Sequence, residues 1–144
     1  MTDTPYRSFM DLALAEARRA AEAGEVPVGA VVVYQGVVVA TGRNTVVADH
    51  DPTAHAEIVA LREAGRELGS ERLTDCDLWV TLEPCPMCAG AISFARIRRL
   101  YYAAQDPKGG AVENGVRLFS SPTCHHVPEV YSGLAETEAS EMLK

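Results

Sequence analysis

The spacing of apolar and polar residues along this 144-residue chain outlines a series of helices and strands. Residues 6–23 carry apolar side chains three and four positions apart with charged residues between them, which predicts an amphipathic helix. Residues 28–34 and 37–41 are dominated by valine, and Gln35 and Gly36 join them as a two-residue linker of the hairpin type. The pattern therefore predicts one helix followed by two antiparallel strands.

The rest of the chain alternates between helical and extended patterns. Further helices are expected at residues 55–68, 84–95 and 134–143, and further strands at residues 78–82, 100–104 and 129–131. Residues 105–128 are rich in glycine and proline, which is typical of a long functional connection. Alternating strands and helices favour an α/β fold with a central sheet, and the opening hairpin makes that sheet mixed. Three consecutive valines at 31–33 predict a first strand covered on both faces.

Composition places the chain among globular proteins, with 47% hydrophobic and 23% charged residues in a length that suits a single domain, residues 1–144. Residues 1–7 lack the basic and apolar regions of a signal peptide, and no apolar run approaches the roughly 18 residues of a membrane span. We therefore expect a cytoplasmic protein with no membrane contact. A net charge of −7 argues against tight non-specific binding of nucleic acid. Arg96, Arg98 and Arg99 form a local basic cluster, which is by default a solvated face.

The residues with the most distinctive chemistry lie near the starts of the second and third predicted helices. His55, Cys85 and Cys88 offer one imidazole and two thiols, a ligand set for a catalytic zinc ion that keeps a fourth position open for water. One ion can take all three if the two helix N-termini converge end-on. Glu57 is then close enough to take and return protons. Structural zinc sites normally use four ligands, and no second pair at matching spacing is present, so a catalytic site is favoured.

Residues 51–58 and 81–92 resemble the two signature blocks of the cytidine deaminase-like superfamily, H-x-E followed by P-C-x-x-C. Within it, the resemblance is to the bacterial tRNA adenosine deaminases, which convert the wobble adenosine of an arginine tRNA anticodon to inosine. It extends to residues 25–31 and 106–111, so nearly the whole chain is covered. The resemblance implies a three-layer α/β/α fold with a mixed five-stranded sheet, one Zn²⁺ per chain, a homodimer, and a tRNA anticodon loop as substrate.

The resemblance also implies roles for individual residues. The implied site consists of His55, Cys85 and Cys88 as zinc ligands, Glu57 as the catalytic acid and base, and Asn44, Ala56 and Asp106 as substrate-binding residues. In the family, the asparagine contacts the base and the aspartate approaches the ribose. The target base is splayed from the loop into the zinc pocket. The three arginines at 96, 98 and 99 would then be candidates for phosphate contacts.

Other functions stay open at this stage. Guanine deaminase resembles the chain in both zinc blocks and binds a free purine base that needs no basic surface, and a deaminase of another free base follows it. A non-catalytic zinc-stabilised RNA-binding subunit is a different class, but such proteins typically lose the carboxylate that Glu57 provides. The tRNA enzymes usually continue into an aromatic, arginine-rich tail, whereas this sequence closes on Glu136, Glu138 and Glu141. Either the chain is trimmed, or substrate affinity is supplied elsewhere, or the substrate is smaller.

Five further residues with metal-binding or reactive side chains have no role in this scheme. Cys76 and Cys124 are expected to be packed or partly exposed thiols without chemistry. His50, His125 and His126 are expected to be surface or hydrogen-bonding histidines, because their spacing supports no specific second metal site.

Overall fold

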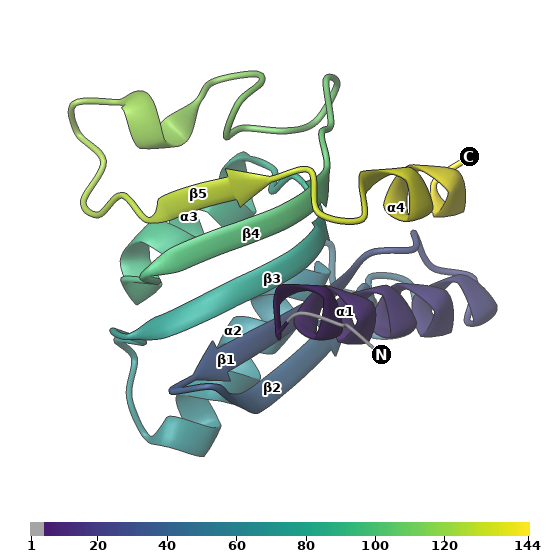
Figure 1. The fold of residues 1–144 in the computed structure, drawn as a ribbon, viewed down its shortest axis with the longest axis horizontal. Coiled ribbons are helices and arrows are strands. Elements are labelled where there is room, and N and C mark those ends of the chain that lie inside the picture. Colours follow the sequence, from purple (N-terminus) through teal and green to yellow (C-terminus); the bar gives the residue numbers. More distant parts are fainter. Residues whose placement is uncertain (1–4) are drawn as a thin grey trace.

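The computed structural model describes residues 5–144, with side chains from Phe9 onward, and shows a five-stranded sheet between two layers of helices (Figure 1). The helices are α1 (Pro5–Glu22), α2 (Ala56–Leu68), α3 (Pro86–Ala95) and α4 (Glu136–Met142), and a short 3-10 helix η1 spans Leu118–Ser120. The strands are β1 (Gly29–Tyr34), β2 (Val37–Arg43), β3 (Cys76–Leu82), β4 (Arg99–Ala104) and β5 (Glu129–Ser132). Every predicted element is present, and the differences from the sequence prediction are confined to the element ends.

The strands lie in the order β2-β1-β3-β4-β5. Strand β1 is antiparallel to both β2 and β3, whereas β4 is parallel to β3 and to β5. Gln35 and Gly36 have φ angles of 52° and 77°, as the tight hairpin between β1 and β2 requires. Helix α3 provides the crossover that joins the parallel strands β3 and β4. The predicted mixed sheet is confirmed, and β3 delivers the chain directly into the helix that follows Cys85.

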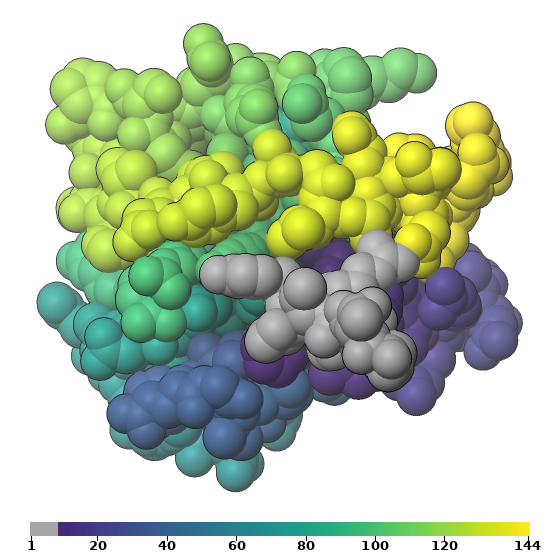
Figure 2. Space-filling model, viewed as in Figure 1, coloured from purple at the N-terminus to yellow at the C-terminus, as the bar shows by residue number. Residues whose placement is uncertain are grey.

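The helices form two layers, with α1 and α4 on one face of the sheet and α2 and α3 on the other (Figure 1). The C-terminal segment that ends in α4 runs across the first face beside α1 (Figure 2). Neighbouring strand residues alternate between the two cores, so that Val31 packs on the α1 side and Val32 on the α2 side, both fully buried. The predicted covering of the first strand on both faces is therefore confirmed.

Within residues 5–144, every helix is too short or too polar to cross a bilayer. The sequence prediction about a targeting segment concerns residues 1–7, and the first four of these lie outside the described part of the chain.

Two glycines allow helices to rest directly on the hairpin. A Cβ atom at Gly29 would lie 2.1 Å from the carbonyl oxygen of Ala13 in α1, and one at Gly42 would lie 2.5 Å from the carbonyl oxygen of Ala56 in α2. Real Cβ atoms are not found at such distances from backbone atoms, so any side chain would push the helix away. The contact at Gly42 fixes the start of α2, which carries two of the predicted site residues.

We expect Gly29→Ala to lower the free energy of unfolding by about 1–3 kcal/mol or more, because the added methyl group overlaps the backbone of α1. Gly90→Ala in α3 is the matched control, since a Cβ there meets nothing within 4 Å. The control should gain about 0.5–1 kcal/mol from the better helix propensity of alanine. Urea denaturation of both variants measures the difference, and equal stability of the two would contradict the close approach of α1.

Candidate active site

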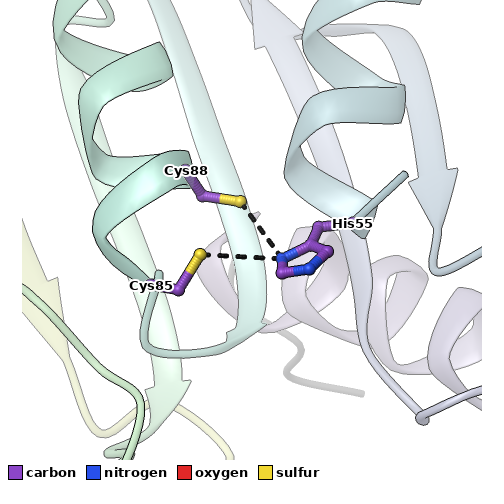
Figure 3. Close-up of side chains that lie close together, drawn as sticks. All are labelled: His55, Cys85 and Cys88. Atoms are coloured by element: carbon purple, nitrogen blue, oxygen red, sulfur yellow. Dashed lines mark hydrogen bonds between the residues drawn. The ribbon is translucent and has the colours of Figure 1, made fainter. Parts of the chain in front are cut away.

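The N-terminal ends of α2 and α3 converge and bring the three predicted zinc ligands together (Figure 3). His55 is the residue before α2 and Cys85 the residue before α3, both with extended backbones. Nδ1 of His55 lies 3.6 Å from Sγ of Cys85 and 3.6 Å from Sγ of Cys88. Within the described part of the chain these three form the one group of possible metal ligands, with all ligand atoms within 4.8 Å of one another. The sequence pattern predicted a helix over residues 84–95 and so placed Cys85 in its first turn. In the structure Cys85 instead precedes α3.

The spacing of these atoms fits a tetrahedral zinc ion. Zinc lies about 2.1 Å from an imidazole nitrogen and about 2.3 Å from a thiolate sulfur, so tetrahedral angles place these two atoms roughly 3.6 Å apart. The observed nitrogen–sulfur distances are both 3.6 Å. A set of three ligands leaves one tetrahedral position free, which is the arrangement of catalytic rather than structural sites.

Without a metal ion, the thiols of Cys85 and Cys88 differ strongly in acidity. A hydrogen bond from the Cys88 thiol lowers the pKa of Cys85 to about 5, and the backbone N–H groups of Cys88 and Met87 lower it further against the effect of burial. The same hydrogen bond, together with burial, raises the pKa of Cys88 well above its ordinary range. A divalent cation can take the place of that hydrogen-bonded proton and hold both sulfurs as thiolates.

Beside the ligands lies a pocket of about 500 Å³ whose lining includes His55, Cys85, Glu57, Asn44 and Asp106. Five of the seven predicted site residues therefore face one cavity. Glu57 lies in the first turn of α2 and is only 4% exposed. Burial raises the pKa of its carboxyl group to about 7, although its own backbone N–H acts in the opposite direction. A carboxyl group of this kind can hold or release a proton near neutral pH.

The predicted substrate-binding residues occupy different positions around this pocket. The Oδ1 atom of Asn44 accepts the backbone N–H of Ala56, the first residue of α2, at 2.8 Å, which leaves the amide nitrogen of Asn44 as a donor for a ligand. Ala56 itself is fully buried and does not line the pocket. Asp106 lines the pocket, and its Oδ1 atom accepts the backbone N–H of Gly109 at 2.9 Å. The structure thus places Asn44 and Asp106 at the cavity and Ala56 behind its wall.

Two buried glutamates near the pocket received no role from the sequence. Glu25 accepts the backbone N–H groups of Val47 and Ala48 at 3.0 and 2.9 Å, which ties down a loop that lines the pocket. Glu83 is 2% exposed and accepts hydrogen bonds from the loop that carries Asp106. An acidic residue directly after an apolar strand was the available signal for Glu83, but the sequence does not say which N–H groups it would accept.

Two of the three arginines in the basic cluster lie beside carboxylates. The guanidinium group of Arg98 donates two hydrogen bonds to Asp77 at 3.0 and 2.9 Å, and this pairing raises the pKa of Arg98. Nε of Arg99 lies 3.6 Å from Oε1 of Glu129. Arg96 donates to the carbonyl oxygen of Ser93 in α3. These partners favour the solvated-face interpretation of Arg98 and Arg99 over phosphate contacts.

The residues without a predicted role also have ordinary surroundings. Cys76 is fully buried, and burial raises the pKa of its thiol to about 11, as expected of a packed thiol. Cys124 donates to the carbonyl oxygen of His126, whose Nε2 lies 2.7 Å from the carbonyl oxygen of Ile97. The expectation of hydrogen-bonding and surface histidines agrees with these contacts and with the ring of His125, which lies 5.5 Å from that of Phe94.

Comparison with known proteins gives consistent matches. Residues 3–104 match the family model of the cytidine and deoxycytidylate deaminase zinc-binding region. A tRNA-specific adenosine deaminase of Agrobacterium fabrum is 65% identical over 136 residues, which cover 94% of this chain and 90% of that protein. Other similar proteins include a tRNA-specific adenosine deaminase of Bacillus subtilis, 42% identical over 94% of this chain and 84% of that protein.

Solved structures show the same likeness. A structure from a study of A-to-I editing by tRNA deaminases at the wobble position superposes with a TM-score of 0.93 at 65% identity, covering 94% of this chain and 99% of that one. A guanine deaminase of Bacillus subtilis superposes with a TM-score of 0.65 at 45% identity, covering 68% of this chain and 63% of that one. The likeness to the wobble-position enzyme is higher in identity, coverage and superposition.

Removal of the metal should expose an unusually acidic thiol. In chelator-treated protein, Cys85 with a pKa of about 5 should react with iodoacetamide at a rate that is already constant between about pH 6 and pH 8 and that falls as the pH drops through its pKa. The buried thiol of Cys76, with a pKa of about 11, is the internal control and should stay unlabelled. Mass spectrometry of the alkylated peptides measures both rates. A rate at Cys85 that climbs with every pH unit up to its ordinary pKa of 9.0 would refute the assignment.

Proposed function

Because this chain belongs to the family of zinc-dependent cytidine and deoxycytidylate deaminases, we propose that it converts the wobble adenosine of a tRNA anticodon to inosine. The reaction consumes water and releases ammonia. The observation that carries the proposal is the meeting of His55, Cys85 and Cys88 in one ligand group beside a pocket that Glu57 lines, in a chain 65% identical to a tRNA-specific adenosine deaminase. A single zinc-dependent deaminase domain over residues 1–144 is part of this proposal.

Zinc held by His55, Cys85 and Cys88 would lower the pKa of a water molecule to about 7 and so supply the nucleophile. Glu57 accepts the proton of the attacking water and gives it to the adjacent ring nitrogen of adenine. In the second half of the reaction Glu57 takes the remaining proton of the added hydroxyl group and passes it to the amino group, so that a C=O bond forms as the C–N bond breaks and ammonia leaves. Because Glu57 is buried beside the ligands, bulk water does not compete for these protons.

The remaining pocket residues bind and orient the nucleoside. The amide nitrogen of Asn44 donates to the base, since its oxygen is already occupied by the backbone N–H of Ala56. Ala56 acts through this hydrogen bond, which holds the asparagine at the pocket. Asp106 lies at the pocket on a loop and is placed to approach the ribose, as the resemblance to the family implies. An adenosine must leave its stack to enter such a pocket, which favours an unpaired anticodon loop over duplex RNA.

We further propose that the protein acts as a homodimer through the outer side of α2 and α3. A hollow of about 680 Å³ lies there, lined by Ile58, Leu61 and Phe94 among others, and it contains none of the predicted site residues. Phe94 is 68% exposed at its edge. The lining also carries both signs of charge, with Arg62 and Glu71, which allows opposite charges to meet across a two-fold axis. A cytoplasmic location follows from the proposed tRNA substrate.

Guanine deamination is the second candidate, because the structure of a guanine deaminase superposes on this chain. A free purine base as substrate would also need no RNA-binding surface. The choice between the two depends on substrate. We expect inosine from an adenosine-containing anticodon stem-loop and no ammonia from guanine, cytosine or free adenosine at comparable concentrations. Turnover of guanine alone would contradict the proposed function.

Glu57→Ala should keep one zinc per chain, because it removes no ligand. Its deamination rate should fall by about 10²–10⁴-fold, because the variant lacks the group that carries the protons. Cys88→Ala should lose both zinc and activity, since it leaves two ligands. Metal analysis and stem-loop deamination together separate the two variants. Full activity of Glu57→Ala would disprove the mechanism.

Phe94→Glu should convert the dimer to a monomer, because it places a charge in an apolar contact. Val37→Glu, at a 62% exposed position in the hairpin, is the matched control and should leave the mass unchanged. Light scattering after gel filtration at micromolar concentration reports the mass. A monomeric wild-type protein, or a dimer that tolerates Phe94→Glu, would rule out this interface.

A further inference from the structure

The buried carboxylate of Glu83 accepts hydrogen bonds from several residues of one loop beside the pocket. Oε1 of Glu83 accepts the backbone N–H of Asp106 at 3.0 Å and the side-chain amide of Asn114 at 2.6 Å. Oε2 accepts the backbone N–H groups of Val112, Glu113 and Asn114 at 3.0, 2.9 and 3.0 Å. Five donors from residues 106–114 thus converge on one side chain. Such a set satisfies a buried negative charge without a positively charged partner.

The loop is shaped to reach this carboxylate. A Cβ atom at Gly110 would lie 2.5 Å from Cδ of Glu83, so only glycine allows the backbone to pass this close. The backbone N–H of Ala111 donates to the carbonyl oxygen of Pro84 at 2.9 Å and secures the same approach from the neighbouring residue. The contact therefore depends on two features, the carboxylate of Glu83 after β3 and the absence of a side chain at Gly110.

The position of Glu83 links this loop to the metal ligands. Glu83 follows the last residue of β3 and stands two residues before Cys85, so it belongs to the short connection that leads from the sheet to the ligands. The other end of its contacts is Asp106, which lines the pocket together with Gly109. A shift of this loop would move Asp106 relative to the ligands, whereas the ligands themselves would stay in place.

We propose that Glu83 is a positioning residue that holds the 106–114 loop at a fixed distance from the metal ligands and thereby places Asp106 against the substrate. The inference rests on the proposed function, because Asp106 has a part only if a nucleoside occupies the pocket. Glu83 touches neither substrate nor metal in this account. Its loss should weaken the binding of the nucleotide and leave proton transfer by Glu57 largely intact.

Glu83→Gln keeps the size of the side chain, but its amide group cannot accept the full set of N–H donors. With zinc-loaded protein and an anticodon stem-loop, we expect kcat/KM to fall on the order of 10²-fold, mainly through KM, since a loop misplaced by about 1 Å has an effect of this size. Zinc content should stay at one per chain. Glu63→Gln on the exposed side of α2 is the matched control and should behave as wild type.

A double-mutant cycle distinguishes positioning from general destabilisation. If Glu83 acts through Asp106, then Glu83→Gln should reduce kcat/KM by less than about threefold once Asp106→Ala is present. An equal reduction in both backgrounds would overturn the proposal, as would an unchanged KM in Glu83→Gln. If Glu83→Gln does not fold, Asn114→Ala tests the same contact, because it removes one of the five donors and keeps Glu83. It should raise KM by about threefold to tenfold, again with little further effect beside Asp106→Ala.

Hydrogen exchange supplies a readout that does not depend on the substrate. The N–H groups of Asp106, Val112 and Glu113 should exchange faster in Glu83→Gln or Asn114→Ala than in wild type, while those of the sheet stay protected. Unchanged exchange would overturn the proposal. If the wild-type protein does not deaminate the stem-loop, that result would instead count against the proposed function. The exchange experiment would still decide whether Glu83 holds the loop.

Discussion

The meeting of two helix N-termini over the end of the sheet is the constraint on which the site depends. His55 and Cys85 each precede a helix, and Cys88 lies in the first turn of the second one, so the distance between the ligands is set by how α2 and α3 pack. That packing is fixed in turn by glycine at Gly42, where α2 touches β2, and by β3, which runs directly into α3. A rigid sheet therefore holds a ligand geometry that neither helix could hold alone.

The polar interior around the site is organised by hydrogen bonds to backbone N–H groups rather than by ion pairs. Asn44 accepts the first N–H group of α2, Glu25 holds the loop at Val47, and Glu83 holds the loop of Asp106. Each of these side chains is buried, and each accepts donors that would otherwise lose their contact with water. Residues close to the substrate can thus lie on loops and still be held in place by the sheet and helix ends.

The local patterns of the chain predicted each α-helix and strand that the structure describes, because apolar period and hairpin linker are short-range features. The 3-10 helix η1 falls within the predicted connection at residues 105–128 and was not predicted. The Cys-x-x-Cys spacing likewise singled out Cys85 and Cys88 as candidate ligands. What these patterns could not predict depends on contacts between distant segments. From the sequence, one ion could bind all three ligands only if His55 and Cys85 came together. Whether they do depends on how α2 packs on α3, which the sequence pattern does not show. The five donors on Glu83 come from residues more than twenty positions away, and the partners of Arg98 and Arg99 lie on other strands.

X-ray absorption at the zinc edge of the purified protein counts the atoms around the ion without reference to activity, and it therefore tests the ligand set itself. We expect one zinc per chain with two sulfur neighbours at about 2.3 Å and two nitrogen or oxygen neighbours at about 2.0–2.1 Å, one of them from the histidine ring and one from solvent. Four sulfur neighbours, or a protein that retains no zinc after purification without chelator, would contradict this ligand set.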